Sequence, residues 1–140
     1  MGSSLYLPVQ VPGALVYTGD PHCAQGDGEV ALTAIECSLK TTFRITLHKD
    51  LAGRKTFTQP FLETPTAFVP LGLDSDLNEA MKDAVRKSIT FMTEVTPLNG
   101  QESLQLGSAA IDFHVTQVVD IVKGIHGVIP KDLIKVDRLR

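Results

Sequence analysis

Residues 76–94 read DLNEAMKDAVRKSITFMTE and carry the clearest secondary-structure signal in the chain. Residues suited to a buried face recur at intervals of three and four, at Leu77, Met81, Ala84, Val85, Ser88 and Met92, while charged residues fall on the other side. The pattern predicts one long amphipathic helix over about residues 76–95, lying on a sheet.

The ends of this helix are also marked. Asp76 can accept hydrogen bonds from the first amides of the helix, and Glu79, three residues later, completes the pattern of a capping box. Thr96 and Pro97 are expected to end the helix, and the Asn99-Gly100 pair is expected to turn the chain.

The segment after this turn predicts a short helix over residues 101–109 and then a strand. Apolar residues alternate with polar ones from Ile111 to Ile121, which is typical of a half-buried strand. Helix followed by strand favours an α+β arrangement.

The first seventy residues are rich in Val, Thr, Leu and Phe and are interrupted repeatedly by Gly and Pro. Such composition predicts strands and turns, and we place strands near residues 5–9, 14–17, 29–38, 41–48 and 66–69. The expected fold is therefore α+β, with mostly antiparallel sheet and hairpins in the first half. Residues 1–140 form a single domain in this interpretation.

Composition limits the classes of function. The 13 basic and 16 acidic residues are scattered and give a net charge of −3, which argues against a nucleic-acid partner. Neither a long apolar run nor a basic leader is found, so we expect a soluble, cytoplasmic protein without membrane contact. The two cysteines, Cys23 and Cys37, are both expected to be reduced, buried thiols.

The densest polar segment is GDPHCAQGDGE, residues 19–29, which holds three carboxylates and an imidazole. Side chains two apart on an extended backbone share a face, so Asp20 and His22 are expected to form one pair and Asp27 and Glu29 a second. A hairpin would bring the two pairs together.

Carboxylates and imidazole are suitable ligands for Zn²⁺ or a similar divalent ion, and an open coordination position would hold a reactive water. A carboxylate that is not a ligand, Glu29 above all, could move a proton to a leaving ammonia. The alternative is a plain hairpin turn or a Ca²⁺-stiffened loop, which the residue types alone favour over a catalytic site.

Two blocks of the sequence carry a further signal. The first comprises residues 5–9, 11–14, 19–22, 25–29 and 34–36, and the second comprises residues 115–120, 123–126 and 129–131. In order and spacing, these blocks resemble the acetamidase/formamidase family. The resemblance extends over nearly the whole chain, and it implies a metal-associated hydrolase that converts formamide, acetamide or similar short amides to a carboxylate and ammonia.

The resemblance also implies the site residues. Asp20, His22, Gln25, Asp27 and Glu29 match the polar motif of the family, with Glu36 and His126 as additions. We predict Asp20, His22 and Glu36 as ligands of a divalent metal ion, Zn²⁺ or Ca²⁺. The remaining assignments are Glu29 and Asp27 as catalytic residues and Gln25 and His126 as substrate-binding residues, although ligands and proton carriers are not distinguished by sequence.

Members of the family are about twice as long, and this chain corresponds to their carboxy-terminal half. The resemblance therefore implies either a homo-oligomer or pairing with the missing amino-terminal half. The alternative function is a non-catalytic fragment or subunit whose acidic Gly-rich loop binds metal for structure or assembly.

Overall fold

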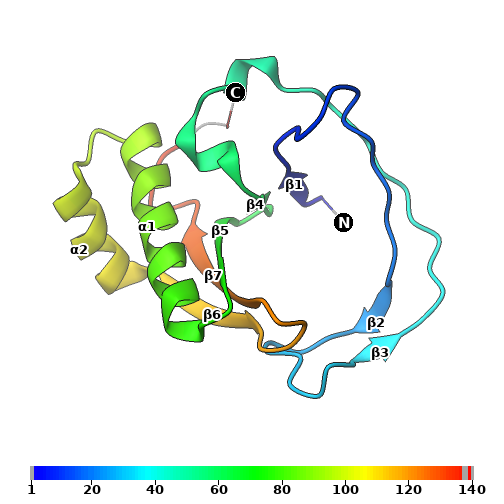
Figure 1. Ribbon diagram of the computed structural model, residues 1–140. Helices are drawn as coiled ribbons and strands as arrows, with labels where there is room; N and C mark the ends of the chain where they lie inside the picture. Colours follow the sequence, from blue (N-terminus) through cyan, green and yellow to red (C-terminus); the bar gives the residue numbers. More distant parts are fainter. Residues whose placement is uncertain (1, 137–138, 140) are drawn as a thin grey trace.

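A computed structural model describes residues 2–136 and 139. Its main sheet has five strands in the order β1 (Ser4–Tyr6), β4 (Phe61–Glu63), β5 (Ala67–Asp74), β7 (Lys123–Pro130) and β6 (Asp112–Gln117), every neighbouring pair being antiparallel. The helices α1 (Leu77–Val95) and α2 (Gly100–Ala110) lie on one side of it (Figure 1). The predicted α+β class with mostly antiparallel sheet is confirmed.

Two minor groups of elements complete the described part of the chain. Strands β2 (His22–Ala24) and β3 (Ile35–Glu36) form a separate two-stranded sheet. Two short 3-10 helices, η1 (Lys49–Leu51) and η2 (Lys55–Thr58), lead into β4. No helix of the described residues is both long and apolar enough to cross a bilayer.

Helix α1 has the predicted bounds and begins at the predicted cap. The Asp76 carboxylate accepts hydrogen bonds from the backbone N–H groups of Asn78 and Glu79, and Thr96 ends the helix. The predicted reciprocal bond from Glu79 is wrong, because the Glu79 carboxylate pairs with Lys82 one turn later. Met81, predicted on the buried face, is exposed, since Ala80 and Ala84 occupy the contact with the sheet.

The predicted second helix is confirmed, but the predicted turn before it is wrong. Asn99 is the N-cap of α2, and Gly100 is its first residue. Here the reciprocal capping box does form, because the Glu102 carboxylate accepts from the backbone N–H of Asn99. Residues 96–99 thus connect the two helices.

The core lies between the sheet and the helices. Phe61 and Phe68 of the sheet contact Phe91 of α1, with ring centroids 5.0 and 4.9 Å from Phe91. Gly72 of β5 allows α1 to approach further, because a Cβ at this position would meet the backbone of Ala80 and Ala84. Helix α1 is therefore fixed on the sheet at two places.

Several strands predicted in the first half are wrong. Residues 14–17 and 41–48 form no strand, and of residues 29–38 only β3 is a strand. Ala14, Leu15, Glu29 and Leu32 have positive φ angles, which break an extended backbone. The strands predicted at residues 5–9 and 66–69 correspond to β1 and β5.

The second half also differs from prediction at two strands. The strand expected from Ile111 to Ile121 ends at Gln117, and Asp120 and Ile121 have positive φ angles. The internal strand β7 was not predicted as a separate element, although it pairs with both β5 and β6. Strand β4 was not predicted either.

Residues 7–47 form two long arms outside the helix-and-sheet body. In Figure 1 the blue and cyan segments run away from β1 to the small β2–β3 sheet and return. Large apolar side chains along these arms are exposed, among them Leu15, Val16, Tyr17, Val30, Phe43, Ile45 and Leu47. In this structure the arms thus contribute little to the core.

Candidate functional site

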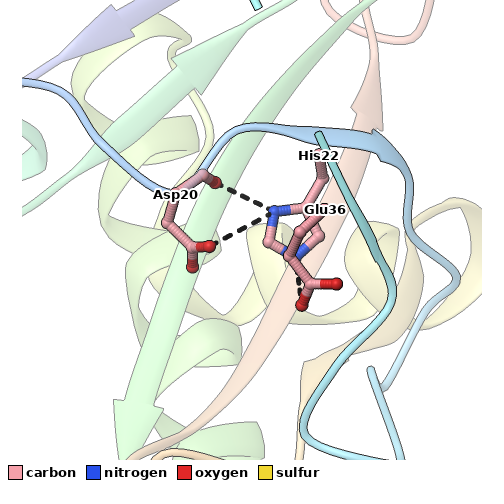
Figure 2. Close-up of side chains that lie close together, drawn as sticks. All are labelled: Asp20, His22 and Glu36. Carbon is pink, nitrogen blue, oxygen red and sulfur yellow. Dashed lines mark hydrogen bonds and ion pairs between the residues drawn. The ribbon is translucent and has the colours of Figure 1, made fainter. Parts of the chain in front are cut away.

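The β2–β3 hairpin brings together three of the predicted site residues. His22 of β2 is the register partner of Glu36 of β3, and Asp20 lies two residues before β2. One ligand atom from each of the three lies within 4.8 Å of the other two (Figure 2). Two carboxylates and an imidazole therefore converge on one small volume.

The two nitrogens of the His22 ring face different groups. Nδ1 lies 2.9 Å from the backbone carbonyl oxygen of Asp20 and 3.9 Å from its carboxylate. Nε2 lies 3.1 Å from Oε1 of Glu29 and 3.5 Å from Oε1 of Glu36. With Nδ1–H donating to the carbonyl, Nε2 faces Glu29 and Glu36, an orientation common among histidines that ligate metals.

The surroundings of His22 attract positive charge. The hydrogen bond to the Asp20 carbonyl and the nearby carboxylates raise the pKa of His22, against a smaller opposing effect of desolvation. The His22 and Glu29 side chains are only 14% and 9% exposed, whereas Asp20 is 82% exposed. The cluster thus has a shielded side at Glu29 and an open side at Asp20.

Glu29 reaches His22 because the preceding residue is fixed to the main sheet. The N–H of Gly28 donates to the carbonyl of Thr116, and the N–H of Val118 donates to the carbonyl of Gly28. Gly28 has a φ of 93°, a conformation that favours glycine. This bridge ties the hairpin loop to the end of β6.

A second cluster lies on the other side of this bridge. Oδ2 of Asp27 lies 3.3 Å from Nδ1 of His114 on β6. His114 is the register partner of His126 on β7, and their rings stack with centroids 5.3 Å apart. Nδ1 of His126 also lies 2.8 Å from the Thr116 hydroxyl.

The environment of His126 disfavours its charged form. Desolvation by burial lowers the pKa of His126, the charge of Asp27 opposes this shift, and the neighbouring His114 adds to it. A neutral imidazole in this place can accept as well as donate a hydrogen bond.

The predicted site residues thus fall into three groups. Asp20, His22 and Glu36 come together, and Glu29 joins them. Asp27 does not pair with Glu29 as expected, because the positive φ angle of Glu29 turns the two side chains to different partners. His126 lies in the second cluster, and Gln25 is exposed and outside the contacts described above.

Sequence reasoning missed His114 as a member of this site. The alternating pattern from Ile111 to Ile121 places His114 on the polar face of a half-buried strand and gives it no role in the site. The missing information was the register of β6 with β7, which places two histidines opposite each other. Recognising β7 as a strand would have revealed the pair.

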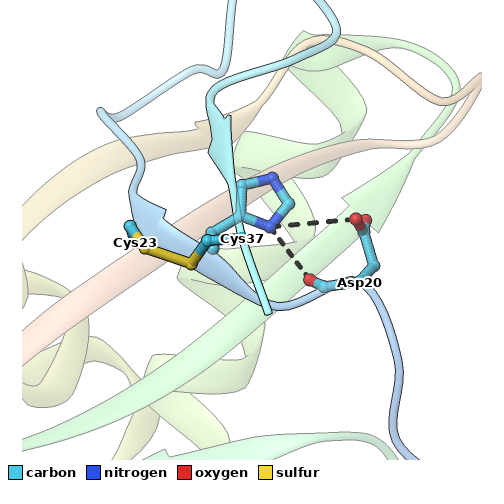
Figure 3. The surroundings of a disulfide bond; sticks show 4 residues. Asp20, Cys23 and Cys37 are labelled. Atoms are coloured by element: carbon cyan, nitrogen blue, oxygen red, sulfur yellow. Dashed lines mark hydrogen bonds and ion pairs between the residues drawn. A yellow bond between two sulfur atoms is a disulfide. The ribbon is translucent and has the colours of Figure 1, made fainter. Parts of the chain in front are cut away.

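The prediction for the cysteines is wrong. Cys23 and Cys37 form a disulfide, and Cys23 is exposed (Figure 3). Cys23 lies at the register irregularity between His22 and Ala24, and Cys37 follows Glu36 on the paired strand, so that their Cα atoms are 5.8 Å apart, close enough for the bond. A separation of 14 residues in sequence did not reveal this proximity.

Comparison with known proteins gives consistent matches. A sequence model of the Acetamidase/Formamidase family matches residues 1–136. A formamidase from Methylophilus methylotrophus is 28% identical over 137 residues, which cover 86% of this chain and 34% of that protein. The chain therefore spans about a third of the length of this curated relative.

Solved structures show the same relation. The crystal structure of an acetamidase from Bacillus halodurans matches with a TM-score of 0.79 and 29% identity, over 96% of this chain and 44% of that one. An acetamidase from Yersinia enterocolitica matches with a TM-score of 0.77 over 94% of this chain and 39% of that one. At 24% identity, the second match shows the fold alone.

Proposed function

We propose, since the chain belongs to the acetamidase/formamidase family, that it supplies catalytic residues for the hydrolysis of short amides such as formamide and acetamide to a carboxylate and ammonia. The main support for this proposal is that three carboxylates surround His22, namely those of Asp20, Glu29 and Glu36. A second cluster, which contains His114 and His126, lies beside them. The names of the relatives support the choice of substrate class.

A divalent ion fits the first cluster by its chemistry. Carboxylate and imidazole ligands suit Zn²⁺, and carboxylate oxygens suit Ca²⁺. The raised pKa of His22 is consistent with a surrounding that stabilises positive charge. A bound ion would polarise the amide carbonyl and lower the pKa of an attacking water.

The geometry gives two assignments for Glu29. If Asp20, His22 and Glu36 are the ligands, Glu29 is the shielded base that takes a proton from the attacking water and passes it to the leaving ammonia. If Nε2 of His22 binds the ion, Glu29 and Glu36 are the nearer carboxylates, at 3.1 and 3.5 Å from that nitrogen. Asp20 would then remain on the Nδ1 side.

The second cluster supplies hydrogen-bonding groups for the substrate. The Asp27 carboxylate lies against Nδ1 of His114 and fixes the orientation of that ring. Burial lowers the pKa of His126 and so favours its neutral form. We propose that His126 contacts the amide, as sequence analysis assigned it, and that Asp27 acts by positioning His114. Gln25 is exposed, so contact with the substrate would require its side chain to turn toward these clusters.

One experiment tests the ion and the chemistry together. The purified chain is assayed for Zn²⁺ and Ca²⁺ binding by calorimetry and for ammonia release from formamide and acetamide, alone and mixed with the remaining part of a relative. His22→Ala should abolish ion binding, whereas His48→Ala, which removes a histidine paired with Asp50, should retain it. Unchanged ion binding in His22→Ala would contradict the ligand assignment.

Two further variants separate the roles of the carboxylates. Glu29→Gln should leave ion affinity intact and remove turnover if Glu29 is the base. A loss of ion affinity of tenfold or more in Glu29→Gln, with little loss in Asp20→Asn, would instead make Glu29 a ligand. Ammonia release by Glu29→Gln at the original rate would overturn both assignments.

The second candidate function is a non-catalytic fragment or subunit whose acidic loop binds an ion for structure or assembly. Two carboxylates and an imidazole within one small volume suit a structural ion as well as a catalytic one. It predicts that an ion raises the melting temperature while short amides remain intact, even with the complementary part present.

The exposed arms indicate which surface of this chain would contact a partner protein. Their apolar side chains suit contact with a second copy or with a segment corresponding to the rest of the relatives. The cytoplasmic location stays a prediction.

A further inference from the structure

We propose that Cys23 and Cys37 are positioning residues for the ion site, and that the redox state of their disulfide controls how tightly the site holds a divalent ion. This inference rests on the ion site proposed above and adds that the disulfide regulates its affinity. Its basis is that each cysteine immediately follows a proposed ligand, His22 and Glu36.

The hairpin that holds these ligands has few other connections. Strand β2 has three residues and β3 has two, with an irregular register between His22 and Ala24. Most residues of both strands are exposed, so no apolar face holds them against the core. A two-stranded hairpin of this kind is marginally stable in water.

The disulfide limits the separation of the two ligands. It joins the two segments directly beside the His22–Glu36 pair, and the N–H of Cys37 donates to the carbonyl of Pro21, the residue before β2. Figure 3 shows the bond next to the contacts of Asp20. With the bond intact, the loop between the strands is closed before an ion arrives, so binding does not have to order it.

Glu29 keeps a second anchor that does not depend on the cysteines. It follows Gly28, which is bonded to the end of β6. Opening the disulfide should therefore release Glu36 from His22 more readily than it releases Glu29. The expected consequence is a weakened ion site in an otherwise folded chain.

The chemical step is a two-electron reduction. A dithiol attacks the Cys23–Cys37 bond through its thiolate, the mixed disulfide is resolved by the second thiolate, and the dithiol becomes a cyclic disulfide. Two electrons and two protons pass to the cysteines, which become thiols. Oxidation reverses the exchange.

The test compares Mn²⁺ affinity of the full chain in its oxidised and dithiol-reduced forms, after removal of the dithiol under anaerobic conditions. Mn²⁺ is chosen because carboxylates and imidazole bind it, whereas the freed thiolates prefer softer ions. We expect affinity to fall by about tenfold on reduction, since a loop of this size must then be ordered by the ion. A Cys23→Ser/Cys37→Ser variant should match the reduced chain and should not respond to dithiol.

The outcomes separate this inference from the ion site beneath it. Equal Mn²⁺ affinity in the oxidised, reduced and double-serine chains would show that the disulfide does not regulate ion binding, and it would still support the ion site itself. Absence of Mn²⁺ binding by the oxidised chain would overturn the ion site and, with it, this inference. Circular dichroism should show the same helix content throughout, because the hairpin lies outside the helix-and-sheet body.

Discussion

At the scale of single residues, Tyr6 is a clear case of a titrating group governed by its contacts. Its hydroxyl donates to Glu63 at 2.8 Å, and burial, this bond and nearby carboxylates raise the pKa of Tyr6 to about 12. The fold thus favours the neutral phenol. This contribution to stability is complete below about pH 10 and is lost as the pH rises through about 12.

The measurement is a spectroscopic titration in a Tyr17→Phe background, where Tyr6 is the remaining tyrosine of the two in the sequence. Phenolate absorbance should appear near pH 12, and Glu63→Gln should move the transition to lower pH by removing the negative charge. A transition near pH 10 in the folded chain would contradict the contact. Tyr6→Phe should cost about 1 kcal/mol of stability.

The pKa of His126 gives a second prediction at this scale. Burial lowers it and Asp27 partly restores it, so Asp27→Asn should lower the pKa further, while His114→Gln should raise it. Because the folded pKa is depressed, this histidine stabilises the fold above about pH 6.5, and the contribution is lost as the pH falls through the folded value.

The check is an NMR titration of the histidine ring protons in the chain and the two variants. Asp50→Asn is the matched control, because it removes the carboxylate beside His48 instead. A pKa of His126 that does not respond to Asp27→Asn would show that the second cluster does not form in solution.

These residues also show what sequence could predict about the site. Asp20, His22 and Glu36 were identified because a local motif and a family resemblance marked them, and the structure places them together. The Asp27–His114 contact and the Cys23–Cys37 bond depend on strand register and on left-handed backbone at positions such as Glu29. Such features arise from long-range packing, which a local pattern does not contain.

At the scale of elements, the sequence predicts an element well when local residues stabilise it, and poorly when the element depends on neighbouring strands. Helix α1 carries its own signal in its periodic apolar face and its Asp76 cap, and both were predicted. Residues 41–48 have strand-like composition but no neighbouring strand, so they remain irregular. The buried strand β7 has no alternation to identify it, because both of its faces are largely covered.

The contact between α1 and β5 predicts the effect of a substitution at Gly72. Gly72→Val should destabilise the fold by about 3 kcal/mol, because the new side chain would force α1 away from the sheet at Ala80 and Ala84. Thermal unfolding measures the change. Gly19→Ala is the control, since open space surrounds that glycine and its loss should leave the melting temperature nearly unchanged; equal effects of both would contradict this account.

At the scale of the whole molecule, 43% of the residues are hydrophobic, yet many of the large apolar side chains are exposed to solvent. Most of these exposed side chains lie on the arms of residues 7–47. The body places its aromatic residues in one core, whereas Tyr17, Phe43 and Ile45 are 96%, 62% and 74% exposed. Exposed apolar surface of this extent is characteristic of protein interfaces. His22, Asp20 and Glu36 lie at the far end of these arms, so a partner that covers the arms would also border this cluster.

This arrangement predicts that the isolated chain associates with itself as its concentration rises. Analytical ultracentrifugation should show a shift from monomer to larger species, and Phe43→Ser/Ile45→Ser should move that shift to a higher concentration without changing the melting temperature, because neither side chain contributes to the core. Leu104→Ser, at a half-exposed position on α2 away from the arms, is the matched control. Addition of the complementary part of a relative should compete with self-association if both use the arms. A chain that stays monomeric at every concentration, with and without that part, would show that the arms fold back onto the body in solution.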